Sequence, residues 1–239
     1  MVAWSPSDVP TPLDYFQCLV ASDTQFPLLE AAASLAQDPY PQVDIESVLA
    51  QMDAWHFRLR RPLNAKADPI AKLRRLNQFF FDELGFAGNV NDYYAPDNSY
   101  LHRVMDTRRG IPISLSVLWL ELAQGLGLQA QGVGFPGHFL VKVKLPDPHE
   151  GLIVLDPFTG QSLGREDLLE RIGQWLGSDG ESLGKRKTDL VLSQHLQACS
   201  PRNMVLRMLK NLQEIYRSRQ EKRLLHLLQM RIEILAQSR

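Results

Sequence analysis

The sequence has few of the features that mark the commoner kinds of functional site. Its 239 residues include only two cysteines, Cys18 and Cys199, and neither lies in a Cys-x-x-Cys pair. With no signal-peptide pattern after Met1, this scarcity predicts a cytoplasmic protein with reduced thiols. The histidines lack metal-ligand spacing, and no glycine-rich phosphate loop is present. We therefore predict no metal and no cofactor.

A strong net charge and long apolar runs are also missing. The formal net charge is −1, so no global field draws the protein to nucleic acid or to an anionic membrane. No apolar run approaches the roughly 20 residues that a membrane span needs. The charge is uneven, however: residues 1–57 contain eight Asp or Glu and no Lys or Arg, whereas residues 201–239 contain nine Lys or Arg and three Glu. Either the two ends lie together in the fold, or the basic tail docks on an acidic partner.

The stretch from residue 108 to 159 contains the best candidates for chemistry. A nearly unbroken apolar segment begins at Pro112 and ends at Gly125 and Gly127, which predicts a buried helix with proline in its first turn. Apolar residues then alternate over 129–144, and a Pro-Gly pair interrupts them just before His138. This pattern predicts two strands with the histidine at the break. A further strand is predicted to end at Asp156.

The order of helix start, His138 and Asp156 is that of papain-like cysteine enzymes, in which the helix end and a histidinium activate a cysteine. Here we expect Asp156 to hydrogen-bond to the ring of His138 and fix its tautomer. The alternatives are a core histidine bonded to backbone and an aspartate that forms a turn. The helix start carries no cysteine. Ser114 and Ser116 follow Pro112 by two and four residues, which turns them about 200° and 40° away from it, and neither is well placed as a nucleophile.

Six short motifs along the chain carry a resemblance to a known family. They are Gly88-Asn89, Asp92-Tyr93-Tyr94, Asn98-Ser99-Tyr100-Leu101, Arg109-Gly110-Ile111-Pro112, Pro136-Gly137-His138-Phe139 and Asp156-Pro157-Phe158. The chain resembles the transglutaminase-like superfamily, and most of all its divergent bacterial SirB-type branch, which joins such a domain to a tetratricopeptide-like tail. The resemblance implies that Pro112 stands where the family's Gly-x-Cys motif has its nucleophile. It also implies that His138 and Asp156 are a relic catalytic dyad.

Resemblance and periodicity together predict an α+β fold in four parts. A helical N-terminal region covers 1–87, and a papain- or transglutaminase-like core with a buried helix and a small antiparallel sheet covers 88–176. Residues 177–199 lack periodicity and are predicted to be a linker. Residues 200–239 show two amphipathic stripes, which predict a tetratricopeptide-like helical hairpin. Such a lone unit must dock on the main domain or on a partner to cover its apolar face.

Two further segments carry candidate binding residues. The polar loop 88–98 either holds its own backbone by local hydrogen bonds and packs on the core helix, or binds a ligand. Arg108 and Arg109 precede a helix N-terminus, where they could bind a carboxylate or pair with Asp92 or Asp97. The predicted binding residues are Asn89, Asp92, Tyr93, Tyr94, Arg109 and Gly137.

Three functions remain open on these grounds. The first is a non-catalytic transglutaminase-like protein that acts as a regulatory or adaptor factor by binding a protein or peptide of unknown identity. The second is an amide-bond hydrolase or transamidase that uses His138 and Asp156 with an unusual nucleophile. The third is a purely structural helical adaptor. The residue at position 112 separates the first two, because proline has no nucleophilic atom.

Overall fold

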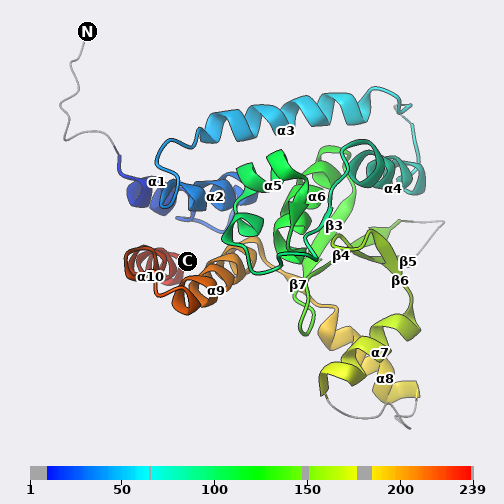
Figure 1. Ribbon diagram of the computed structural model, residues 1–239. Coiled ribbons are helices and arrows are strands. Elements are labelled where there is room, and N and C mark those ends of the chain that lie inside the picture. Colours follow the sequence, from blue (N-terminus) through cyan, green and yellow to red (C-terminus); the bar gives the residue numbers. More distant parts are fainter. Residues whose placement is uncertain (1–9, 65, 147–150, 177–184, 238–239) are drawn as a thin grey trace.

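The protein folds as a helical array packed against one face of an antiparallel sheet, as the computed structural model shows (Figure 1). The structure describes residues 10–64, 66–146, 151–176 and 185–237. Within these residues the larger sheet has five strands in the order β6-β5-β4-β3-β7, and each neighbouring pair is antiparallel. The predicted α+β class is confirmed.

The sheet strands show the two-residue alternation that the sequence predicts. They are β3 (Gln129–Val133), β4 (Leu140–Leu145), β5 (Gly151–Asp156), β6 (Gln161–Leu163) and β7 (Ala198–Cys199). Val141 and Val143 belong to the main hydrophobic core, whereas Leu140 and Val154 belong to a second, smaller cluster with residues of α7 and α8. Each face of the sheet is therefore covered by a different group of helices.

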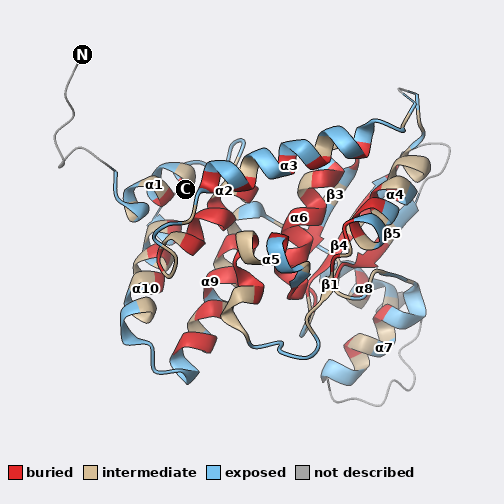
Figure 2. Ribbon diagram, turned by 45° about the horizontal axis from the view of Figure 1, so that its top comes forward, coloured by how far each residue is buried: buried red, intermediate tan, exposed pale blue. Residues whose placement is uncertain are grey.

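Helix α6 (Pro112–Gly125) lies at the centre of the molecule. Almost all of its side chains are buried, and Figure 2 shows it as a red ribbon surrounded by other elements. Proline at the first position fits the helix start, and Gly127, at φ +69°, adopts the left-handed conformation that commonly follows a helix end. Because α6 contacts β3 and β4 on one side and helices on the others, it connects the sheet to the helical array.

The N-terminal α-helices are α1 (Pro12–Leu19), α2 (Leu28–Ser34) with a 3₁₀ turn (Leu35–Gln37), α3 (Ile45–Arg60) and α4 (Pro69–Asn77), which continues as a π-helix (Gln78–Glu83). Three of the four begin after a residue whose side chain caps them; α2 begins after Pro27 without such a cap. Thr11 and Asp14 form a reciprocal capping box, and Asp44 accepts a hydrogen bond from the Ser47 N–H. The apolar periodicity from Ile70 to Leu84 predicts one continuous α-helix. The structure differs in that the second half of this helix, Gln78–Glu83, is a π-helix.

Between the array and the core helix, short elements bring the polar loop to the sheet. These are the parallel pair β1 (Ala87–Gly88) and β2 (Arg109–Gly110), a 3₁₀ turn (Pro96–Ser99) and α5 (Leu101–Thr107). The pairing of β1 with β2 places the loop between them beside the start of α6. None of the described helices is both long and apolar enough to cross a membrane.

The C-terminal helices α9 (Pro201–Ser218) and α10 (Lys222–Gln237) pack on each other and on the N-terminal helices. The buried stripe of α9, including Met208, Leu209 and Leu212, belongs to the main core. Arg202 pairs with Asp23, at 2.6 Å between Nε and Oδ1, so the acidic and basic ends of the chain do meet. The tail covers its apolar face against its own fold.

The predicted linker differs from the structure. Residues 177–184 lie outside the described residues, but α7 (Arg165–Leu176) is followed by α8 (Lys185–His195) and then by β7. Leu192 packs in the smaller cluster, and Cys199 pairs with Gly132 at the edge of the sheet. This segment has little apolar periodicity of its own, so its helix and strand depend on tertiary contacts with the sheet and with α7. The division of the chain into four domains stays a prediction.

Candidate active-site relic

His138 and Asp156 lie in direct contact where two neighbouring strands meet the same end of the sheet: His138 just precedes β4, and Asp156 ends β5. Nε2 of His138 is 2.8 Å from Oδ1 of Asp156, so the expected hydrogen bond is present. Asp156 ends β5 and is fully buried, whereas the His138 side chain keeps 22% of its surface exposed. Gly137, at φ +65°, makes the turn that aims the histidine, a conformation that other residues adopt at a cost.

The carboxylate of Asp156 is held by two further donors. The Phe158 N–H donates to Oδ1 at 3.0 Å, and Nη1 of Arg171 donates to Oδ2 at 3.2 Å. Burial by itself would raise the pKa of Asp156, but the hydrogen bonds from His138, Phe158 and Arg171 outweigh it and hold the pKa below its ordinary value. Asp156 is therefore ionised at neutral pH, and Nε2 of His138 carries the proton that it donates.

The start of α6 offers no free nucleophile among the candidates in the sequence. Pro112 is buried at the first helical position. The Ser114 hydroxyl donates to the Asn98 carbonyl at 2.6 Å, and the Ser116 hydroxyl donates to the Pro112 carbonyl at 2.7 Å. Both serines are fully buried. Their hydroxyl protons are thus bound to backbone carbonyls rather than to a general base such as His138.

The polar loop holds its own shape through two asparagines. The Asn89 amide donates to Oδ1 of Asn98 at 2.9 Å, and the Asn98 amide donates to the carbonyls of Asp92 and Tyr93 at 2.6 and 3.1 Å. The predicted local hydrogen bonding is therefore present. The two tyrosines that the loop presents are nonetheless accessible, since Tyr94 is 75% and Tyr93 39% exposed.

Phe158 connects this loop to the histidine. Its ring centroid lies 6.0 Å from that of His138 and 5.9 Å from that of Tyr93, with edge-to-face geometry in both pairs. The Gly88 N–H donates to the Phe158 carbonyl at 2.9 Å. A Cβ on Gly88 would lie 2.4 Å from the Phe158 ring, so only glycine permits this approach. The Gly88 and Asp-Pro-Phe motifs therefore meet in one place.

The predicted pairing of Arg108 or Arg109 with Asp92 or Asp97 is wrong. Arg108 has φ +59° at the C-terminus of α5, and its guanidinium lies over the rings of Trp55 and Phe86, 4.8 and 5.1 Å from their centroids. Arg109 donates from Nη1 to the Gly85 carbonyl at 2.8 Å. Asp97 pairs instead with Arg103, at 3.0 Å. The left-handed residue turns the chain, which sequence spacing did not indicate.

Two arginines of this site were not predicted. Arg171, on α7, binds the dyad carboxylate. Arg207, on α9, donates from Nη2 to the His138 carbonyl at 2.7 Å and lies over the Phe139 ring, 5.4 Å from its centroid. No motif marks either residue, because each reaches the dyad from a helix outside the predicted catalytic stretch.

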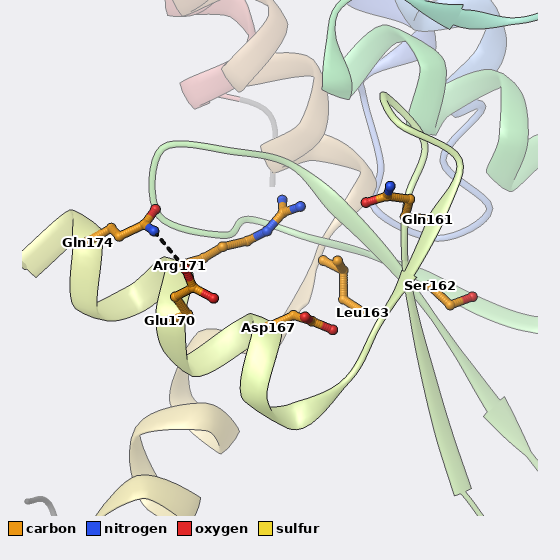
Figure 3. A pocket seen from close by; sticks show the side chains of 7 residues that line it. All are labelled: Gln161, Ser162, Leu163, Asp167, Glu170, Arg171 and Gln174. Carbon is orange, nitrogen blue, oxygen red and sulfur yellow. Dashed lines mark hydrogen bonds between the residues drawn. The ribbon is translucent and has the colours of Figure 1, made fainter. Parts of the chain in front are cut away.

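Two cavities are lined by residues of this site, one by Arg171 and the other by Tyr93 and Tyr94. One of about 500 Å³ is lined by Gln161, Ser162, Leu163, Asp167, Glu170, Arg171 and Gln174. Figure 3 shows Arg171 extending from α7 across this cavity, with Gln174 bonded to Glu170 beside it. A second, of about 360 Å³, is lined by Tyr93, Tyr94, Ile111, Asn211, Glu214, Ile215 and Ser218. Over the described part of the chain, no three His, Cys, Asp or Glu side chains are grouped to hold a metal ion.

A histidine–aspartate pair on an antiparallel sheet, with a buried helix packed against that sheet, is the arrangement that the resemblance to the transglutaminase-like superfamily predicts for an α+β protein. The profile of the transglutaminase-like superfamily matches residues 46–210, and the chain belongs to that superfamily.

Similar proteins occur both in bacteria and in mammals. The UPF0162 protein of Xylella fastidiosa (strain 9a5c) is 36% identical over 195 residues, which cover 81% of this chain and 66% of that protein. The UPF0162 protein of Vibrio cholerae is 29% identical over 171 residues, 72% of this chain and 59% of that protein. Mouse F-box only protein 21 is 46% identical over 70 residues, 29% of this chain and 11% of that protein. The chain thus spans about two thirds of the length of the Xylella relative and a smaller share of the other two.

Proposed function

We propose that this protein is a non-catalytic member of the transglutaminase-like superfamily that binds a protein or peptide as a regulatory or adaptor factor. The observation that carries the proposal is the start of α6: Pro112 is buried where the resemblance puts the nucleophile, and the neighbouring serine hydroxyls are bound to carbonyls. Removing the nucleophile from such a site leaves only binding and oxyanion stabilisation.

The accessible face of the polar loop supports a binding role. Tyr94 and Val90 are 75% and 74% exposed, although the loop backbone is held by the asparagine network. A rigid loop that presents aromatic and aliphatic side chains to solvent is typical of a protein-binding surface, because little ordering entropy is lost on binding.

The test is affinity purification from cell extract with the full chain as bait, followed by mass spectrometry. We expect Tyr94→Ala to lower recovery of the specific partner at least fivefold. Phe57→Ala is the matched control, since Phe57 is 72% exposed on α3. Equal loss with both variants, or no loss with either, would remove the Tyr93–Tyr94 loop from the proposal.

An enzyme of the amide-bond class is the second candidate, favoured by one observation. The His138–Asp156 hydrogen bond is intact at 2.8 Å, although a relic need not keep it. Purified protein is assayed for ammonia release from glutamine peptides and for cleavage of a peptide library. Activity that His138→Ala abolishes would replace the adaptor proposal by the enzyme; absence of activity in both assays supports the adaptor.

Three finer features complete the proposal. We place the chain in the SirB-type branch, and we regard α9 and α10 as one tetratricopeptide-like unit, supported by their two amphipathic, mutually packed helices. We also propose a cytoplasmic location, supported by the two free cysteines, Cys18 and Cys199, which such a compartment keeps reduced.

A further inference from the structure

Arg207 carries a positive charge beside the dyad without a carboxylate partner in the described part of the chain. Its hydrogen bond goes to the neutral carbonyl of His138, and its guanidinium lies over the Phe139 ring. The one nearby carboxylate of the dyad, Asp156, is already shared by His138 and Arg171. The described ion pairs leave Arg207 unmatched.

The two titratable groups that act electrostatically on Arg207 are neutral at neutral pH. They are the Cys199 thiol and the Tyr93 hydroxyl, and burial raises the pKa of each. Burial also lowers the pKa of the Arg207 guanidinium, as expected for a charge that is partly removed from water. A partly desolvated guanidinium interacts strongly with an anion that reaches it.

Arg207 lies one helical turn before the residues of α9 that line the aromatic cavity. Asn211 follows it by four residues on α9, so both side chains lie on the same helix face. Asn211 lines the cavity of about 360 Å³ together with Tyr93 and Tyr94. The Tyr93 ring also lies 5.9 Å from the Phe158 ring, which contacts His138, the residue whose carbonyl Arg207 binds. The cavity, which Glu214 also lines as the ion-pair partner of Arg217, therefore lies close to a cation that has no carboxylate partner among the described residues.

We infer that Arg207 and Tyr93 form a carboxylate-binding subsite beside this cavity, and that the bound peptide presents a carboxylate to it. The guanidinium offers several N–H donors and the tyrosine one O–H donor, which is the donor set that a carboxylate accepts. The carboxylate comes from a peptide C-terminus or from an Asp or Glu side chain. This inference rests on the proposed peptide-binding function.

Three peptide libraries of equal length separate these sources. The first has free C-termini and no Asp or Glu, the second is the same library with amidated C-termini, and the third is amidated with one internal Glu. The full chain is expected to bind the first or the third at least tenfold more tightly than the second. Equal binding to all three overturns the inference and leaves the peptide-binding proposal standing.

Variants locate the effect on Arg207. Arg207→Gln keeps a donor for the His138 carbonyl but removes the charge, and it is expected to lose the preference for the carboxylate library. Lys210→Gln is the matched control, because Lys210 is an exposed cation three residues further along α9. Thermal melting checks that both variants fold. A preference that survives in Arg207→Gln, or disappears equally in Lys210→Gln, contradicts the assignment.

A small probe decides the question if no library binds. In that case the peptide-binding proposal fails, and sodium benzoate is titrated while nitrogen-edited NMR observes the Arg207 Nε–H signal. A saturable shift that is absent with benzamide and absent in Arg207→Gln supports the subsite by itself. No shift with benzoate overturns it.

Discussion

Asp38 and Arg231 form a buried, bidentate ion pair that joins the N-terminal helices to α10. Nε and Nη2 of Arg231 donate to the two carboxylate oxygens of Asp38 at 2.7 and 2.9 Å. Arg231 is fully buried, and its guanidinium lies over the Phe16 ring, 4.9 Å from the centroid. The uneven charge of the sequence allowed the two chain ends to lie together in the fold, and this contact between them is in the core.

Breaking this pair from one side should be costly. Arg231→Met leaves the Asp38 carboxylate buried without its partner, and we expect a loss of about 3–5 kcal/mol in the free energy of unfolding. The double variant Arg231→Met with Asp38→Leu should lose less than either single change. Urea unfolding measures all of these. Arg217→Met, which removes an exposed pair with Glu214, is the control and should change stability by only about 0–1 kcal/mol. A single Arg231 variant as mild as this control would contradict the assignment.

Removing the tail should destabilise the whole molecule. Truncation after Gln197 removes β7, α9 and α10, and exposes core residues that pack on Met208, Leu209 and Leu212. We expect a lower Tm for the remaining domain and binding of an apolar dye. About 1 M salt should change the Tm of the full chain only slightly, because screening acts on exposed pairs rather than on the leucines. If the truncated protein has the same Tm as the full chain, the tail is an independent arm.

Acid should weaken the fold through Asp156. Its pKa is lower in the folded than in the unfolded state, so the ionised carboxylate contributes stability above the ordinary aspartate pKa of about 4. That contribution is lost as the pH falls through the folded pKa. Asp156→Asn should therefore be less stable than wild type near neutral pH and should lose less stability in acid. Unfolding by urea across that pH range measures both slopes, and parallel slopes would contradict the expectation.

Restoring a cysteine should not restore a reactive site. Position 112 is buried, and proline there has no N–H and a fixed φ that suits the first helical turn. We expect the Pro112→Cys thiol to react slowly with iodoacetamide at neutral pH. Native Cys18, which is exposed, is the internal standard for an accessible thiol. Faster labelling of position 112 than of Cys18, mapped by mass spectrometry, would reveal an open, thiolate-stabilising pocket.

Local features of the chain could be predicted because few neighbouring residues determine them. Proline after a capping residue marked the starts of α1 and α9, and alternation marked β3 and β4. The order of Pro112, His138 and Asp156 along the chain indicated the dyad, and the hydrogen bond between His138 and Asp156 is present in the fold. Capping, periodicity and strand breaks act over one or two turns of chain, so they are readable without knowledge of the rest.

Contacts between distant segments were decided only by the tertiary structure. Arg171 and Arg207 reach the dyad from α7 and α9, and Asp38 meets Arg231 across 193 positions of sequence. The segment expected to be a linker gains a helix, α8, because packing on the sheet supplies apolar contacts that its own pattern lacks. The sequence by itself determined the helices and strands that have a strong periodicity of their own, and the order of the dyad residues along the chain. Which charged side chains surround that dyad depends on how the helices pack, and no local pattern encodes it.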